Sequence, residues 1–446
     1  MKRSVWLRSV EAASGVLLGL FLFQGCATNP VTGDKELSFI SESQEIQMGR
    51  EYYGPTQQTQ GGPYKTIPAL TTYVNEIGQE LARESDRPDL PYEFVVLNNG
   101  TPNAWALPGG KIAINRGLLS VLENEAELAA VLAHEVVHAA ARHSAQQMER
   151  QTLGGAIASA AVIGVGAAVS DNPNRDLIVG AAHTTAALGT QVIFSRYSRE
   201  AEKEADYYGM QYMSRAGYDP QAAVTLQEKF VKLAEGRNPN WLEGLFASHP
   251  PSQERVEKNR ETAASLPEGG RIGNADYQAQ MRPLMEPQPA YDTYREAAQA
   301  FEKGEVDSSL NLVNQAIGML PEESHFYGLK ARLLAQKGNS RGALQAIETA
   351  ISKNSDYFAF HMIEGQIHND LGNRSQAQVA FQRSNALLPT AESQAALGFL
   401  ALEAGNESRA YEYLSQAAQY SDTKAGSAVR QALLPLDMER NPAKYM

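Results

Sequence analysis

Two histidines that stand four residues apart are the first candidates for chemistry, in the run His134-Glu135-Val136-Val137-His138. Residues four apart lie on one face of a helix, so both imidazoles can reach the same point. A catalytic zinc ion takes three protein ligands and keeps a water as its fourth, and Glu135 would stand beside that water to remove a proton. The spacing therefore predicts a zinc hydrolase, with two buried structural histidines as the alternative.

The third zinc ligand should come from further along the chain. In the longer motif that contains three histidines, the last one would fall at residue 144, which is Ser144 here. His143 is one residue short of that position, and we expect it to be a surface or capping histidine. A carboxylate from a later helix is the better candidate, because zinc also accepts Asp and Glu oxygen.

Glu202 and Asp206 supply such carboxylates on a helix that is predicted to begin after Ser198. Because they are four residues apart, the two side chains share one face of that helix. One could bind zinc while the other accepts a hydrogen bond from the second nitrogen of a ligand histidine. A solvated acidic helix is the alternative, and we expect Glu200 and Glu204 to be solvated in this way.

Four stretches of the chain resemble HtpX-type zinc metallopeptidases, which are related to the CAAX prenyl protease. They span about residues 40–260 and are Asn103-Ala-Trp-Ala-Leu-Pro-Gly-Gly110, His134–His138 with Ala141–Ser144, Ser198–Asp206, and Ser248-His-Pro-Pro-Ser-Gln-Glu-Arg255. The resemblance implies hydrolysis of peptide bonds with Glu135 as the general base. It also implies that His134, His138 and Glu202 bind zinc, and that Asp206 supports the catalytic site as a hydrogen-bond partner of a ligand.

The same resemblance favours a substrate-binding role for residues 103–114. A protease commonly holds the substrate backbone by adding it to the edge of a sheet. The residues expected at this edge are Asn103, Ala104, Trp105 and Gly110. The alternative is a strand that only packs on the catalytic helix.

His249 lies in a loop whose prolines exclude regular helix, in Ser248-His-Pro-Pro251. The resemblance places it near the metal as a further catalytic-site residue, and three roles stay open. It could fill the open position of the zinc ion as a latch, donate a hydrogen bond to the developing oxyanion, or brace the loop with Arg255 paired to a carboxylate. We favour the latch, since an exported protease with broad recruitment needs restraint.

The elements that must position these residues are mostly helices. A capping box formed by Asn124 and Glu127 is predicted to begin the catalytic helix. Further helices are predicted over residues 41–52, 67–84 and 218–235, and short strands over 92–97 and 111–115. These elements predict a mostly helical α+β domain with a small β-sheet over residues 41–264, and the resemblance implies that this is a zincin-type metallopeptidase domain.

Two later segments have unusual composition. Thr152–Val169 and Leu177–Leu188 are weakly apolar stretches rich in Ala and Gly, for which we prefer a helical flap over the site to a membrane hairpin. Residues 265–290 are rich in Gly and Pro, and are predicted to link two domains.

A repeat of about 34 residues follows over residues 291–446. Turn glycines recur at intervals of 34, 34 and 33 residues, at Gly304, Gly338, Gly372 and Gly405. Small residues repeat in step with them. This period and pattern match the tetratricopeptide helix–turn–helix unit and predict an all-α tetratricopeptide solenoid, whose concave face binds peptide or a partner protein.

The amino terminus indicates export. Residues 1–25 carry a basic start and an apolar run, which is typical of a signal peptide, and the only cysteine, Cys26, follows at a position that resembles a lipoprotein processing site. We expect Cys26 to carry a lipid anchor, residues 26–40 to be an extended leader, and the protein to lie in the bacterial periplasm at the outer membrane. One cysteine also excludes an internal disulfide.

The charge balance limits which classes of binding partner are expected. With 39 basic and 51 acidic residues the chain has a net charge of −12, which argues against nucleic acid. We expect an exported zinc (Zn²⁺) endopeptidase for misfolded or assembly-stalled envelope proteins, with repeats that recruit the substrate or an envelope assembly partner. A chaperone or binding module with a latched or vestigial site is the alternative. A prenyl-protein protease is less favoured, since strong membrane spans are missing from the sequence.

Overall fold

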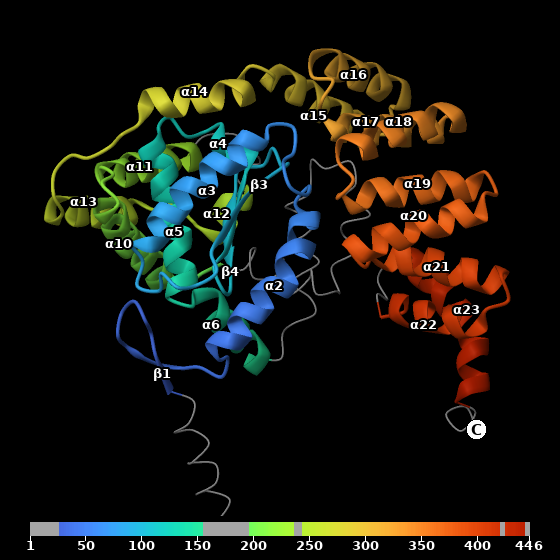
Figure 1. Ribbon diagram of the computed structural model, residues 1–446, viewed down its shortest axis with the longest axis horizontal. Helices are drawn as coiled ribbons and strands as arrows, with labels where there is room; N and C mark the ends of the chain where they lie inside the picture. The colour runs from blue at the N-terminus through green and yellow to red at the C-terminus, as the bar shows by residue number, and fades with distance from the viewer. Residues whose placement is uncertain (1–25, 155–195, 236–242, 420–423, 442–446) are drawn as a thin grey trace, which may run out of the picture.

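The computed structural model describes residues 26–154, 196–235, 243–419 and 424–441 (Figure 1). The predicted signal peptide and the predicted flap beyond residue 154 lie outside these ranges. A helical body with a three-stranded sheet and a separate two-stranded hairpin occupies one side of the molecule, and stacked helix pairs occupy the other. The predicted fold class, a mostly helical α+β domain followed by an all-α tetratricopeptide solenoid, is confirmed. Across the described ranges, no helix is both long and apolar enough to cross a membrane.

The small sheet has three strands in the order β3 (Glu93–Leu97), β5 (Lys111–Asn115) and β4 (Ala104–Leu107). β5 pairs parallel with β3 and antiparallel with β4. The two predicted strands are present, and the segment expected to join them contributes β4 as a third. All four residues of β4 are buried, so its run Ala-Trp-Ala-Leu shows no alternation that would mark a strand in the sequence.

The catalytic helix α5 (Glu125–Ala140) lies against the sheet and is buried almost all round. Asn124 accepts a hydrogen bond from the backbone N–H of Glu127 at 2.9 Å, as predicted for the helix start. The reciprocal bond of the capping box is replaced, because the Glu127 carboxylate accepts from the backbone N–H of Glu123 at 2.8 Å instead. The helices that pack around α5 include α3 (Pro68–Arg83), α10 (Arg199–Arg215) and α11 (Gln221–Glu235). Helix α13 (Gln253–Ser265) packs in turn on α10 and α11.

Helix α2 (Glu42–Thr59) is longer than predicted. The capping box of Ser41 and Gln44 forms as expected, but the helix continues through Pro55 instead of ending near Tyr52. Its last turn is buried, and Gln58 donates to the carbonyl of Asp356 at 2.7 Å within the repeats. These tertiary contacts outweigh the loss of one helical hydrogen bond at the proline.

Residues 26–40 form a hairpin rather than an extended leader. β1 (Cys26–Thr28) pairs antiparallel with β2 (Lys35–Leu37). The chain that follows is tied to α6 (His143–Gly154), where the Glu149 carboxylate accepts the backbone N–H groups of Phe39 and Ile40 at 2.7 and 2.8 Å. A carboxylate that satisfies successive N–H groups stabilises an otherwise irregular segment.

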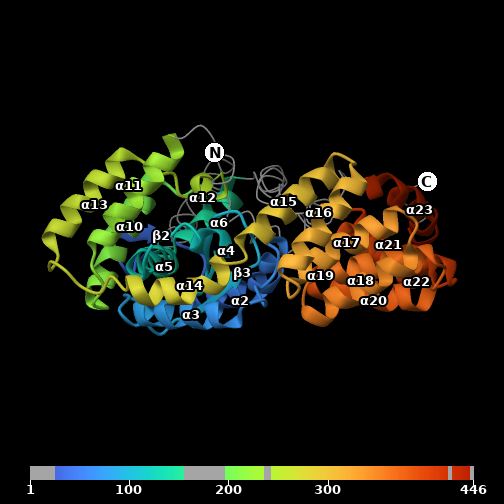
Figure 2. The same cartoon turned by 90° about the horizontal axis from the view of Figure 1, so that it is seen from above.

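The segment expected to be a linker contains α14 (Asn274–Met285), and α15 (Gln288–Glu302) follows it (Figure 2). Tyr277, Met281 and Leu284 are buried in the same hydrophobic core as α5. This core continues into the first repeats as far as Leu333. The peptidase part and the first repeats therefore share one core.

The repeats are antiparallel helix pairs, and positive φ angles of 71–77° at Gly304, Gly338, Gly372 and Gly405 close the turns that the sequence marked. Glycine adopts this left-handed conformation without steric cost. The pairs are α15 with α16 (Val306–Met319), α17 (Ser324–Gln336) with α18 (Ser340–Lys353), α19 (Phe358–Asp370) with α20 (Arg374–Leu387), and α21 (Ala391–Glu403) with α22 (Glu407–Ala417), before α23 (Lys424–Arg440).

A buried carboxylate joins the repeats to the sheet. Glu323, at the start of α17, is fully buried and accepts four hydrogen bonds, two on each oxygen. Asn98 and Thr66 donate at 2.8 Å from the peptidase part, Tyr291 donates at 2.9 Å, and the backbone of His325 donates at 3.1 Å. Burial alone would raise the pKa of Glu323, but His325 and Arg116 together lower it below its ordinary value.

We predict that Glu323→Gln destabilises the protein by about 1–3 kcal/mol, because an amide NH₂ would face donors that now share an oxygen. Thermal unfolding followed by circular dichroism measures this. The lowered pKa means that the ionised Glu323 stabilises the fold above the pKa of an unfolded Glu and ceases to do so at lower pH. The difference between the wild type and the variant should therefore shrink as the pH falls below about 4.

Glu322→Gln is the matched control, because the neighbouring Glu322 side chain is 71% exposed and forms an exposed ion pair with Lys353. We expect a change within about 0.5 kcal/mol for it. Equal effects of the two variants would contradict the role of Glu323.

Candidate metal centre

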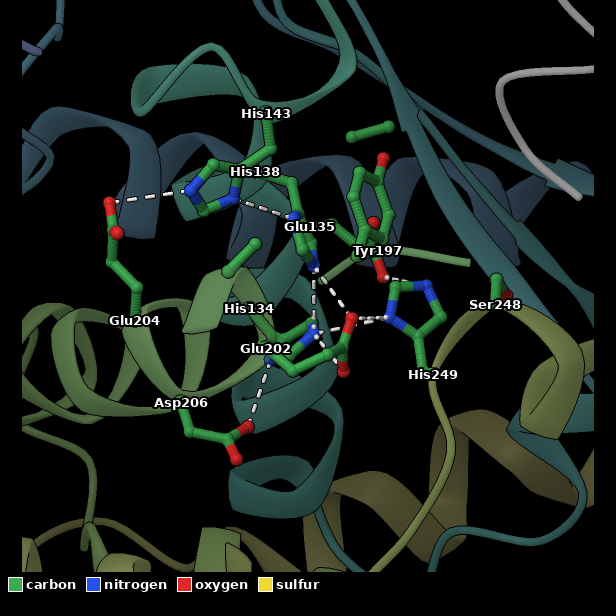
Figure 3. Close-up of polar contacts among 12 residues, drawn as sticks. His134, Glu135, His138, His143, Tyr197, Glu202, Glu204, Asp206, Ser248 and His249 are labelled. Carbon is green, nitrogen blue, oxygen red and sulfur yellow. Dashed lines mark hydrogen bonds and ion pairs between the residues drawn. The ribbon is translucent and has the colours of Figure 1, made fainter. Parts of the chain in front are cut away.

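Helix α5 presents His134 and His138 on one face, where they meet Glu202 from α10 (Figure 3). The two Nε2 atoms lie 3.0 Å apart. The Glu202 carboxylate lies 3.6 Å from Nε2 of His134 and 3.5 Å from Nε2 of His138. Together with His249, these groups place four ligand atoms within 4.8 Å of one another.

This arrangement fits a zinc ion. Two atoms bound tetrahedrally at about 2.0–2.1 Å stand about 3.3 Å apart, and the separations here lie on both sides of that value. Asp206 accepts a hydrogen bond from Nδ1 of His134 at 3.0 Å, which leaves Nε2 of His134 as an acceptor. That lone pair faces the Glu202 carboxylate, which also can only accept. A cation would satisfy both groups.

Burial and charge keep His138 and Glu202 in the protonation states that bind metal. Burial lowers the pKa of His138 well below its ordinary value, so the ring is neutral. Burial alone would raise the pKa of Glu202, but His249 and Arg255 outweigh it and hold that pKa well below its ordinary value. Glu202 is therefore an ionised carboxylate.

Arg255 on α13 pairs with both acidic residues of α10. Its Nε and Nη2 donate to the two oxygens of Asp206 at 2.7 Å each, and its Nη1 lies 2.8 Å from Oε2 of Glu202. The sequence predicted that Arg255 pairs with a carboxylate only in the case that His249 braces its loop. In the structure, it fixes the carboxylate that orients His134 and the one that faces the metal position.

A close helix crossing brings α10 to α5. Gly209 lies directly against α5, and a Cβ there would be 3.2 Å from the backbone nitrogen of His134. Such a distance is tighter than ordinary van der Waals contact, so a larger residue would push the helices apart. The absence of a side chain at Gly209 thus helps set the distance between Glu202 and the two histidines.

His143 and Glu204 are at the site, although His143 was expected to be a surface or capping histidine and Glu204 a solvated side chain. Nδ1 of His143 is 2.8 Å from Nδ1 of His138, and its Nε2 is 3.3 Å from the Glu204 carboxylate. Arg142, with φ of 63°, turns the chain after α5 so that His143 faces back to His138. The sequence missed this pair because their contact depends on how α6 and α10 pack.

Tyr197 is a further site residue that the sequence analysis missed. Its ring stacks on His138 with centroids 3.9 Å apart and planes 17° apart. Its hydroxyl is 2.8 Å from Oγ of Ser144, which in turn donates to the carbonyl of Ala106 on β4 at 2.8 Å. In the sequence, the one clue that Tyr197 lies near the site was its position directly before the predicted helix cap Ser198.

Glu135 is 2% exposed and lies beside the ligand group. Its Oε1 is 3.5 Å from Nε2 of His249, and its Oε2 has no hydrogen-bond partner among the described residues. Burial raises the pKa of Glu135 above its ordinary value, which makes the carboxylate a stronger base. A buried, unpaired carboxylate oxygen is what a general base for a bound water requires.

His249 occupies the fourth corner of the ligand group. It follows α12 (Glu243–Ser248), and its Nδ1 is 3.0 Å from Oε1 of Glu202 and 3.3 Å from Nε2 of His134. Burial would lower the pKa of His249, but Glu202 and Glu135 raise it above its ordinary value. The ring is thus placed where a latch would be, and it also contacts the base.

Of the four residues expected to bind substrate, Asn103 and Ala104 have polar groups that do not bond β5, whereas Trp105 pairs with β5 and Gly110 lies in a turn. Asn103 is 1% exposed, and neither its side-chain oxygen nor its nitrogen has a partner among the described residues. The carbonyl of Asn103 bonds β5, so Ala104 presents its backbone to the free edge and Trp105 faces β5. Gly110, with φ of 80°, is a turn residue packed on the ring of Tyr92.

Comparison with known proteins matches residues 68–263 to peptidase family M48. The chain is 32% identical over 242 residues to the beta-barrel assembly-enhancing protease of Escherichia coli K12, a match that covers 54% of this chain and 48% of that protein. It is 33% identical over 264 residues to the mitochondrial metalloendopeptidase OMA1 of Schizosaccharomyces pombe, covering 58% and 72%. The chain thus spans about half the length of the Escherichia coli relative.

A similar solved structure is a thermophilic tetratricopeptide protein from Thermus thermophilus, at 21% identity and a TM-score of 0.30. That similarity covers 41% of this chain and 94% of the other.

We predict that His143→Phe weakens zinc binding by about 10–100-fold, because His138 loses the hydrogen-bond partner that orients its ring. Competition with a chelator of known zinc affinity measures the change. His368→Phe, in the repeats, is the matched control and should bind zinc as the wild type does. An unchanged zinc affinity in His143→Phe, with both variants folded, would show that His143 does not support the ligand.

Proposed function

Because the chain belongs to peptidase family M48, we propose that it is an exported zinc endopeptidase that cleaves misfolded or assembly-stalled envelope proteins. The observation that carries this proposal is the convergence of His134, His138 and Glu202 beside the buried base Glu135. Neutral imidazoles and one carboxylate, with a base on the same helical turn, are the set that peptide hydrolysis requires.

The residues divide the work of hydrolysis. His134, His138 and Glu202 would hold the zinc ion, which when bound polarises a water and the peptide carbonyl. Glu135 would accept a proton from the attacking water and return it to the leaving nitrogen. Asp206, held by Arg255, keeps the His134 ring in the tautomer whose Nε2 is free.

Substrate would bind along β4. Ala104 can offer its backbone N–H and C=O to an extended peptide, as in other strand-addition complexes. The unpaired amide of Asn103 is a further polar group at this edge, since a buried amide without partners is costly unless a ligand completes its bonds. Trp105 would hold β4 in place by pairing with β5, and Gly110 would help position β4 by forming the turn between β4 and β5.

Export and location rest on the amino terminus and on the relatives. The Escherichia coli relative is named for enhancing β-barrel assembly, which supports work on envelope proteins in the periplasm. We place a lipid anchor on Cys26 at the outer membrane, and an unmodified Cys26 in the intact mass of the mature protein would refute it. The repeats would recruit substrates or an assembly partner on their concave face.

A latched binding or chaperone module is the second candidate. The position of His249 favours it, because Nδ1 of His249 lies 3.0 Å from Glu202 and fills the corner that water would need. In the peptidase proposal, His249 is a reversible latch that the substrate displaces.

We predict that Glu135→Gln abolishes cleavage of an unfolded envelope protein and keeps the zinc content of the wild type. The amide preserves the shape of the side chain but cannot accept the proton. Cleavage is followed by electrophoresis and zinc by elemental analysis, with His138→Ala as the control that loses metal. Wild-type cleavage by Glu135→Gln would rule out the assigned base.

We predict that His249→Ala increases cleavage or self-cleavage, because the fourth corner of the ligand group becomes free. The double variant with Glu135→Gln should be inactive, which shows that the gain comes from the same site. A large loss of kcat with zinc retained would instead identify His249 as an oxyanion donor. Lowered stability alone would identify a brace. A slower, fully metallated and stable variant would therefore exclude the latch.

A further inference from the structure

A cavity opens beside the ligand group and extends away from it between α5, α10, α11, α12 and α13. Its volume is about 60 Å³, and its lining includes His134, Glu135 and His249. One water needs about 10–15 Å³ of such a volume, so the cavity has room for about four to six waters or for one large side chain. The catalytic roles described above leave its apolar lining unused.

The walls of the cavity are apolar. They are formed mainly by Val131, Met210, Met213, Leu226, Phe230 and Leu245. Asp206 and Arg255 also line it, but their charged groups are paired with each other. Away from Glu135 and His249 at the ligand group, these walls offer no free partner to a charged side chain, so its burial there would cost free energy.

Besides Glu135 and His249 at the ligand group, Gln227 is a lining residue with a polar atom that lacks a partner. Gln227 on α11 is 5% exposed, and its Nε2 makes no hydrogen bond to any residue in the described part of the chain. An unpaired buried donor costs about 1–3 kcal/mol. A ligand group that can share a hydrogen bond with this amide would recover that cost.

We propose that this cavity binds the side chain of the substrate residue that flanks the scissile bond, and that it selects large uncharged side chains, above all tyrosine. The inference rests on the proposed peptidase activity. The apolar walls accommodate an aromatic ring, and the tyrosine hydroxyl can pair with the amide of Gln227 because it both donates and accepts. Contact with the base Glu135 places the bound residue next to the reacting peptide bond.

The position of the pocket also links selectivity to the latch. Leu245 and His249 both line the cavity, and they belong to α12 and the loop that directly follows it. A movement of this segment that removes His249 from the ligand group therefore shifts one wall of the pocket. A side chain that fills the pocket would compete with the closed position of the segment.

The test uses the full-length protein with zinc and a series of peptides that differ only in the residues on either side of one cleavage site. At one of these two positions, we expect Tyr, Phe and Leu to give a kcat/KM at least about tenfold above that of Ala, Asp or Lys. Mass spectrometry identifies the bond that is cleaved.

Two variants examine the pocket itself. Ala223→Leu, which adds volume to a lining residue, should reduce kcat/KM for Tyr and Phe peptides at least about tenfold relative to the Ala peptide. Gln227→Leu should remove the preference for Tyr over Phe and keep cleavage of Phe. Thr225→Leu, on the exposed side of α11, is the matched control and should leave the profile unchanged. Thermal unfolding and zinc content confirm that each variant is folded.

The outcomes separate this inference from the proposed function. Cleavage without side-chain preference, or an equal effect of Ala223→Leu on all peptides, would overturn the pocket and leave the peptidase intact. A wild type that cleaves no more than Glu135→Gln would overturn both.

Discussion

The buried guanidinium of Arg255 is the interaction on which the candidate metal centre depends. It pairs with Asp206 and Glu202 on α10 and donates to the carbonyl of Pro250 at 3.2 Å. It thus fixes the carboxylate that orients His134, the carboxylate that faces the metal, and the loop that carries His249. Removal of one partner from such a buried ionic network typically costs about 3–5 kcal/mol, because the other charges stay buried without compensation.

The two histidines of α5 are supported in different ways. His134 bonds to the carboxylate of Asp206, whereas His138 bonds to another imidazole, His143, and stacks on Tyr197. The Tyr197 hydroxyl reaches β4 through Ser144. The ring of His138 is therefore connected to the strand that we propose for substrate binding, so the metal ligand and the substrate edge are held by one set of contacts.

The first repeats and the peptidase part of this M48 chain form one packed body. Their hydrophobic core is continuous from the sheet to α17, and Glu323 satisfies donors from both sides. A partner bound on the first repeats would therefore lie at a defined position relative to the metal centre. A flexible tether would offer only a high local concentration.

The sequence by itself determined what depends on spacing along one element. It predicted the shared face of His134 and His138, the face of Glu202 and Asp206, and the turn glycines of the repeats, because helical periodicity and left-handed turns are local properties. The tertiary structure decided which distant side chains meet these faces. His143 and Tyr197 reach His138, and Glu204 reaches His143. Helix α2 continues through Pro55, and residues 26–37 fold back as a hairpin, because packing between elements outweighs local preference.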